Sequence, residues 1–229
     1  MYEVIRLVHL SPAADSAALT ARLRAWAAPS RDDRATASLP AHLRWCAGTA
    51  RHALIQPTLP GVRNGGDLLV HLRFDDPDTC SAAAAQLDAV LADPTVTHLD
   101  GAEYTGGTAG SADPHTPATV HRVLLLRVAP DTPPATVRAF EADLLRMPTH
   151  IPTIRSWQLS TVRHPTGSIP WTHVWEQEFT DLAALQGPYL LHPIHWAHVD
   201  RWFDPECPES IVRDRVCHSF CPNEPLPPT

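Results

Sequence analysis

The sequence predicts an α+β protein made of two tandem units, each with a four-stranded antiparallel sheet and helices on one face. The 229-residue chain repeats one plan at a period of roughly 115 residues, which is too long for a solenoid. A stretch rich in Gly, Ser, Thr and Pro separates the two copies and indicates a linker. The opening strand of the second copy is apolar without interruption, which is typical of strands covered on both faces.

Each copy opens with a strand followed by a helix. Residues 3–12 (EVIRLVHLSP) align with residues 121–130 (HRVLLLRVAP), and both segments end in a small residue followed by Pro. The helical spacing of apolar residues that follows is clear in residues 131–147 (DTPPATVRAFEADLLRM). We expect Asp131 to cap this second helix, with the two prolines in its first turn.

The remaining elements also repeat. Residues 67–74 (DLLVHLRF) align with residues 172–179 (THVWEQEF) as strands, each followed by a helix and a last strand. The order strand, helix, strand, strand, helix, strand is that of a ferredoxin-like unit. Because the strands need cover on both faces, we expect the two sheets to pack together as an intramolecular α/β barrel. The expected boundaries are a first unit over 1–106, a linker over 107–118, a second unit over 119–220 and a tail over 221–229.

Composition excludes several classes of function. The net charge is −7 at pH 7 and there is no basic run, so we expect no nucleic-acid partner. All 18 basic residues are arginines, which excludes Schiff-base chemistry on a lysine. No apolar run approaches the roughly 18 residues of a membrane span. Glu3 and Arg6 do not fit a signal peptide. Five cysteines fit free thiols better than a disulfide framework, so we expect a cytoplasmic protein. Because the duplicated plan lets the chain complete its own barrel, we expect a monomer or weak dimer.

Residues 187–199 (GPYLLHPIHWAHV) carry one tyrosine and three histidines in an otherwise apolar segment. His192 directly before Pro193 fits an ordinary helix start. Buried imidazoles and a phenol must be hydrogen-bonded, however, and a cluster of them suits a pocket that moves protons. Tyr189 and His195 are the candidate catalytic residues.

The second copy resembles the stress-responsive A/B-barrel family of dimeric α/β-barrel proteins. The matching segments are VHRVLLLRV, MPTHIPTIRSW, WTHVWEQEF and the Tyr-x-x-His-Pro-x-His motif of YLLHPIH, and they span residues 119–220. The first copy resembles the family only in its plan. The resemblance implies that this chain is a tandem duplication carrying both halves of one barrel.

Within the family, the second copy is most similar to polyketide cyclases, which close a linear polyketide by aldol condensation. That resemblance implies a general base at His195 and a hydrogen-bonding partner for it at Tyr189. The first copy has Glu3, Leu68, Val90 and Val96 at the four matching cavity positions, so we expect it to supply no site. The expected substrate-binding residues are His121, His173, Trp175, His192 and Trp196.

The sequence therefore favours a cofactor-independent cyclase of the lyase or isomerase class. Its substrate would be a small hydrophobic, polyketide-like carbonyl compound supplied by a polyketide synthase, and we expect no metal. Two alternatives remain open. One is a metal or haem enzyme that uses His121, His173 and His195 as ligands. The other is a non-catalytic protein that binds a small hydrophobic ligand.

Overall fold

The computed structural model describes residues 1–28, 50–112 and 115–227 of the chain. Within these residues, nine strands form one antiparallel sheet in the order β2-β3-β1-β4-β7-β8-β6-β9, with β5 beside β7. The first four strands and the last four follow the same order within their own unit. The α+β class and the two tandem ferredoxin-like units are thus confirmed.

The first unit follows the predicted order of elements. Helix α1 begins after Asp15, whose carboxylate accepts a hydrogen bond from the Ala18 amide at 2.9 Å. Helix α3 begins after Asp76, which accepts from the Thr79 amide at 2.7 Å. Both caps satisfy amides that have no partner within the helix. The elements are β1 (Tyr2–Leu10), α1 (Ser16–Ala27), β2 (His52–Pro57), β3 (Leu68–Phe74), α3 (Pro77–Leu91) and β4 (Val96–Thr105).

The second unit differs from expectation at the start of its long helix. Helix α4 begins at Pro134, so the prediction that Asp131 caps it is wrong. A cap at Asp131 would have to bind the amides of Pro133 or Pro134, and proline has none. The remaining elements are β5 (Thr108–Ser111), β6 (Val120–Leu126), α4 (Pro134–His150), β7 (Ile154–Thr166), β8 (His173–Phe179), α5 (Leu182–Ala184), η3 (Leu185–Tyr189), η4 (Ile194–Val199), η5 (Asp200–Trp202) and β9 (Cys217–Pro222).

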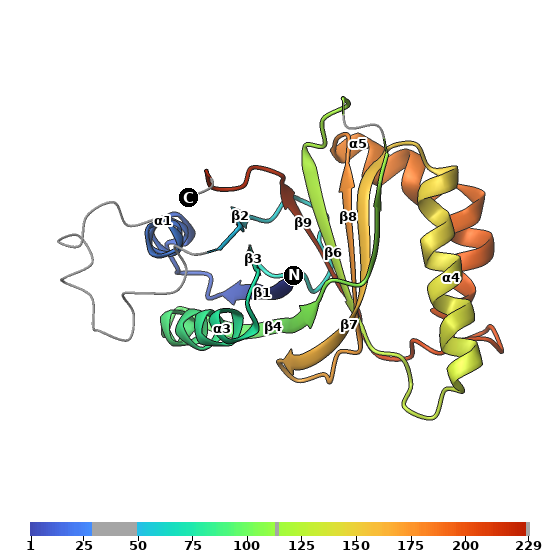
Figure 1. The fold of residues 1–229 in the computed structure, drawn as a ribbon, viewed down its shortest axis with the longest axis horizontal. Coiled ribbons are helices and arrows are strands. Elements are labelled where there is room, and N and C mark those ends of the chain that lie inside the picture. The colour runs from blue at the N-terminus through green and yellow to red at the C-terminus, as the bar shows by residue number, and fades with distance from the viewer. Residues whose placement is uncertain (29–49, 113–114, 228–229) are drawn as a thin grey trace.

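The two units join along both edges of their sheets. On one side β4 pairs with β7, from Gly101 opposite Thr166 onwards. On the other side, Arg63 and His218 of β9 exchange backbone hydrogen bonds of 2.9 and 2.8 Å. The sheet therefore nearly closes into a barrel within one chain. Figure 1 shows α1 and α3 on the outer side of the first unit, and α4 with the helical segment 182–202 on the outer side of the second.

Strand β6 divides its side chains between two buried layers. In β6, Val123 and Leu125 face the barrel interior, whereas Leu124 and Leu126 pack towards the outer helices. This alternation is the ordinary pleat of a strand. It explains why the segment VLLLRV has no polar face, as both of its sides are covered.

Part of the expected linker is a strand. β5 pairs with β7, with Thr108 opposite Leu159. Gly107 precedes it, and a Cβ atom at this position would lie 1.9 Å from the Leu159 carbonyl oxygen. The close approach of β5 to β7 therefore requires glycine here. Residues 113–114 of the expected linker lie outside the described residues.

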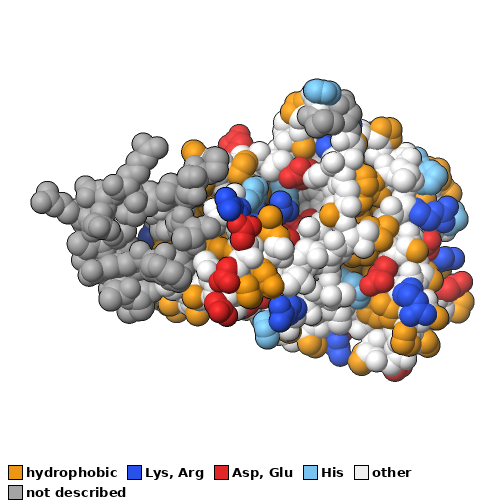
Figure 2. Space-filling model, in the orientation of Figure 1, with side chains coloured by type: hydrophobic (Ala, Val, Ile, Leu, Met, Phe, Trp, Pro, Cys, Tyr) orange, Lys and Arg blue, Asp and Glu red, His pale blue; other side chains and the backbone are white. Residues whose placement is uncertain are grey.

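The charge distribution on the surface and the state of the cysteines are as the composition predicts. In Figure 2 acidic and basic side chains are interspersed on the visible face. In the part of the chain that the structure describes, no helix is long and apolar enough to span a membrane. Cys80, Cys207, Cys217 and Cys221 are all free, and Cys46 lies outside the described residues.

Replacing Gly107 with alanine should weaken the junction between the units. The added methyl group must displace β5 from β7, and we expect a loss of about 1–3 kcal/mol in the free energy of unfolding, as for other overpacking changes. Chemical denaturation measures it. Gly187→Ala is the matched control, because no atom of the described residues lies within 4 Å of the position its Cβ would take. Equal effects of the two substitutions would contradict the role of Gly107.

Candidate functional site

The sheet separates His121 from the other candidate residues. His121 faces the barrel interior, where it pairs with Glu178 of β8. His173 begins β8 opposite Leu126 and therefore lies on the face that packs against the helices. Directly opposed residues of antiparallel strands share a face, and alternate residues change face. The structure thus does not bring His121 together with His173 and His195, the set considered above as a metal or haem site.

Tyr189 and His195 do lie together. Their rings meet edge to face with centroids 4.9 Å apart. Tyr189 is buried at the end of η3, and His195 in η4 is partly exposed, with Nδ1 3.3 Å from the Asp200 carboxylate. Both elements are π-helical turns, and such turns occur frequently at functional sites. Pro188 and Pro193 lack amide protons, which accounts for the irregular helix between residues 182 and 202.

A buried arginine completes this cluster. The Arg122 guanidinium carbon lies 5.2 Å from the centroid of the Tyr189 ring. Its Nε donates to His218 Nε2 at 2.8 Å, and its Nη1 donates to Gln177 Oε1 at 2.5 Å. Among the described residues, no carboxylate forms an ion pair with Arg122, although it is only 4% exposed. We call Arg122, Gln177, Tyr189, His195 and His218 the Tyr189 site.

Burial keeps Tyr189 and His218 neutral in the Tyr189 site and leaves Arg122 as its cation. Burial raises the pKa of Tyr189 above its usual range, against the opposing charge of Arg122, so the phenol keeps its proton. Burial and the Arg122 charge hold the pKa of His218 at about 2, so this imidazole stays neutral. Burial lowers the pKa of Arg122. The site therefore offers a hydrogen-bond donor and an unpaired positive charge.

His173 lies far from the Tyr189 site. Its Nδ1 is 2.8 Å from Thr172 Oγ1, and its Nε2 is 3.3 Å from Glu141 Oε1. Tyr189 packs on Phe179 at the other end of β8. Six residues of strand, about 20 Å, separate the two ends. His173 is therefore held by its own partners at a different place on the same face.

The other residues expected to bind substrate lie partly in the hydrophobic core and partly at the surface. Trp175 is fully buried in the same hydrophobic core as Tyr189. His192 Nδ1 accepts from the Ile194 amide at 3.2 Å, as a residue at a helix start does. Trp196 is 59% exposed, so it lies at the surface beside the cluster.

A second polar cluster fills part of the barrel interior. Glu3 Oε2 accepts from His71 Nε2 and from Arg73 Nε, each at 2.9 Å. Glu176 Oε2 accepts from the Tyr104 hydroxyl at 2.9 Å. Gln158 Nε2 donates to both carboxylates, at 2.6 Å for Glu3 and 3.2 Å for Glu176. With His121 added, we call these residues the barrel cluster: Glu3, His71, Arg73, Tyr104, His121, Gln158 and Glu176.

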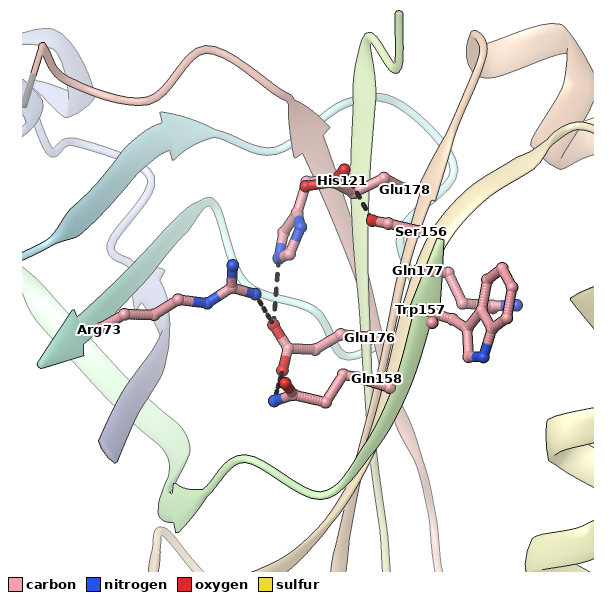
Figure 3. A pocket seen from close by; sticks show the side chains of 10 residues that line it. Arg73, His121, Ser156, Trp157, Gln158, Glu176, Gln177 and Glu178 are labelled. Atoms are coloured by element: carbon pink, nitrogen blue, oxygen red, sulfur yellow. Dashed lines mark hydrogen bonds and ion pairs between the residues drawn. The ribbon is translucent and has the colours of Figure 1, made fainter. Parts of the chain in front are cut away.

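The barrel cluster opens on a cavity of about 180 Å³. Figure 3 shows Arg73 and His121 directed towards Glu176 in this cavity. Arg73 Nη2 lies 3.3 Å and His121 Nε2 lies 3.9 Å from Glu176 Oε1. The first unit thus contributes polar groups here, although the resemblance implied that it had lost its site residues.

The two carboxyl groups of the barrel cluster differ in their acidity. Burial alone would raise the pKa of Glu3, but His71 and Arg73 outweigh it and hold this pKa at about 2. Burial raises the pKa of Glu176, with the charge of Glu3 adding to the effect. Glu176 was not among the site residues expected from the sequence. The predicted barrel was the available signal, because it implies that both faces of β8 are buried.

Histidines that are buried or half-buried should make the protein sensitive to acid. Burial lowers the pKa of His52 from 6.5 to about 3 and that of His218 to about 2, and it lowers the pKa of His121 well below its usual range. The unfolded chain therefore binds more protons than the folded one below pH 6.5, so stability falls as pH falls from 6.5 to 3. Each group contributes roughly 1.4 kcal/mol per pKa unit of difference.

Urea unfolding in the presence of EDTA, repeated from pH 8 to pH 4, measures this loss. The variant His52→Gln should show a shallower dependence on pH than the wild type. A wild-type stability that stayed constant or rose towards pH 4 would contradict the neutral state of these histidines.

Several solved structures share the fold. An anthrone oxidase-like protein aligns with a TM-score of 0.61 at 9% identity, over 96% of this chain and 90% of its own. A protein of Fusobacterium nucleatum provisionally assigned as a monooxygenase aligns with a TM-score of 0.58 at 8% identity, over 98% and 92%. A mutant chlorite dismutase from Candidatus Nitrospira defluvii aligns with a TM-score of 0.51 at 9% identity, over 96% and 90%. These likenesses concern the fold alone.

Sequence comparison is more specific for the second unit. No curated protein matches the chain. Residues 120–217, however, match the sequence model of the stress responsive A/B barrel domain. This range begins with β6 and ends where β9 begins, and it contains every residue of the Tyr189 site except His218. The second unit of this chain therefore belongs to the stress-responsive A/B barrel family.

Proposed function

We propose that the protein is an enzyme that closes a ring in a small hydrophobic, polyketide-like carbonyl compound, and that the Tyr189 site performs the reaction. The observation that carries the proposal is Arg122, a buried cation with no carboxylate partner among the described residues, lying over the Tyr189 ring. A buried charge without a counter-ion is costly. A substrate that becomes negatively charged during reaction would compensate it.

The three side chains suit an aldol-type condensation. His195, in its neutral form, removes a proton from the carbon next to a carbonyl group. Tyr189 donates a hydrogen bond to the resulting enolate oxygen, and Arg122 stabilises its negative charge. The enolate carbon then forms a bond with a second carbonyl carbon of the same substrate. The protonated His195 returns its proton to the new alkoxide, so the step needs no oxidant or reductant.

The surroundings support a hydrophobic substrate. Leu190, Leu191 and Trp196 are exposed by 41%, 75% and 59%, and all three belong to the helical segment that carries Tyr189 and His195. This apolar surface beside the site suits a polyketide chain or the synthase that delivers it. The structural neighbours are described as an anthrone oxidase-like protein, a monooxygenase and a chlorite dismutase, which supports small-molecule chemistry for the fold.

His195→Ala should lower turnover by about 10²–10⁴, the usual contribution of a general base, and leave the melting temperature nearly unchanged. Tyr189→Phe should have a smaller effect on the rate and little effect on KM. The assay follows cyclised product from linear polyketide thioesters by chromatography. His198→Ala is the matched control, because His198 is exposed in the same helical turn. Full activity of His195→Ala, or tight binding without turnover by the wild type, would reject the mechanism.

Arg122→Met tests the observation on which the proposal rests. Methionine keeps much of the side-chain volume and removes the unpaired charge, which favours stability, but it leaves His218 Nε2 and Gln177 Oε1 without their donor, which lowers it; we therefore expect only a small net change in stability. Turnover should fall by about 10²–10³, as when other groups that stabilise developing negative charge are removed. Denaturation and kinetics on the same preparation separate the two effects. A variant that lost stability and kept its activity would show that Arg122 is purely structural.

A further inference from the structure

We propose that the barrel interior binds one divalent transition-metal ion through His71, His121 and Glu176. One ligand comes from β3 of the first unit, and two come from β6 and β8 of the second. A ligand atom of each residue lies within 4.8 Å of the other two, and all three residues are buried. The sequence led us to expect no metal, and the only set considered, His121 with His173 and His195, is divided by the sheet.

The distances are close to those of a metal site. Glu176 Oε1 lies 3.4 Å from His71 Nε2 and 3.9 Å from His121 Nε2. In a tetrahedral zinc site, with metal–ligand bonds near 2.0–2.2 Å, ligand atoms lie about 3.3–3.5 Å apart. On metal binding, His71 Nε2 must give up its hydrogen bond with Glu3, and the three ligand atoms, which lie within 4.8 Å of one another, must draw closer.

Unpaired nitrogen atoms point to a missing ligand. Among the described residues, both ring nitrogens of His121 and Nδ1 of His71 are buried without a hydrogen-bond partner, whereas His71 Nε2, which lies 3.4 Å from Glu176 Oε1, is bonded to Glu3 Oε2 at 2.9 Å. Most buried polar atoms do have a partner, so such a group calls for a water molecule or an ion. Burial also holds the pKa of His121 well below its usual range, which keeps the imidazole in the neutral form that binds metals.

Charge favours a cation beside Glu176. The salt bridge between Glu3 and Arg73 pairs two of the charges. Burial raises the pKa of Glu176, so its carboxylate lacks sufficient compensation. Its Oε2 is held by Tyr104 and Gln158, which leaves Oε1 to bind the metal. Arg73 Nη2 also lies 3.3 Å from Oε1 and is the competing cation.

The ligand set indicates the class of metal. Two imidazoles and one carboxylate suit zinc, iron(II) and neighbouring divalent ions rather than calcium or magnesium. His121 and Glu176 also line the cavity of about 180 Å³, so a water molecule or small ligand could reach the metal. This site lies on the opposite face of β6 and β8 from the Tyr189 site. The proposed metal binding and the proposed cyclisation can therefore be tested separately, and either can be wrong without the other.

The test is titration of the full-length, EDTA-treated protein with Co²⁺, followed by visible absorption and by competition with Zn²⁺. We expect one ion per chain. His71→Gln and Glu176→Gln should each weaken binding at least about 100-fold, because even the residues that only orient metal ligands contribute 10–100-fold. Arg73→Gln should strengthen binding by removing the competing cation. That gain would not follow from general damage to the fold.

Two controls keep the result specific. His52→Gln should bind normally, since the His52 ring lies 5.6 Å from the His71 ring but outside the ligand set. His195→Gln should also bind normally, which excludes the Tyr189 site. X-ray absorption of the wild-type zinc complex should show imidazole ligands and no thiolate. Absence of stoichiometric binding, thiolate coordination, or equal binding by the His71 and Glu176 variants would overturn the proposal.

Discussion

Closure of the sheet within one chain is the constraint on which the other features depend. The β4–β7 pairing and the contacts beside β9 bring two sheets face to face, and helices cover their outer sides. Strands within the barrel, such as β6 and β8, then bury both of their faces. Consecutive residues of one strand therefore lie in two different layers: His121 faces the barrel interior, and Arg122 faces the layer between the sheet and the outer helices. The chain has two separate polar clusters because neighbouring side chains are separated in this way.

The barrel cluster lies where the two units meet. Glu3, His71, Arg73 and Tyr104 from the first unit contact Gln158 and Glu176 from the second, so neither unit satisfies these groups alone. Burying several charges costs solvation energy that their mutual attraction only partly returns. Their hydrogen bonds do, however, specify how the sheets align, which apolar contacts specify poorly. The same arrangement leaves two imidazoles and a carboxylate oxygen facing one another.

The Tyr189 site, unlike the barrel cluster, is built around a pair of residues that are close in sequence. Tyr189 and His195 are six residues apart in one irregular helical segment, and prolines at 188 and 193 set its π-helical turns. Arg122 reaches the pair from the strand beneath. The site thus combines a local pair, the Tyr189 phenol and the His195 imidazole, with a long-range contact to the Arg122 guanidinium. The proposed reaction needs the local pair for its base and the guanidinium to stabilise the anion.

The sequence by itself determined the tandem plan, the order of elements and the proximity of Tyr189 to His195. The tandem plan and the order of elements rest on periodicity and repeated segments, which are local properties, and the family resemblance implied that Tyr189 is the partner of His195. Only the tertiary structure decided that His121 faces His71 and Glu176 and turns away from His173. Which residues share a face depends on the pairing register, and a shift of one residue exchanges the two faces. For the same reason Arg122 and the groups of the first unit could not be assigned to a site before the sheet was known.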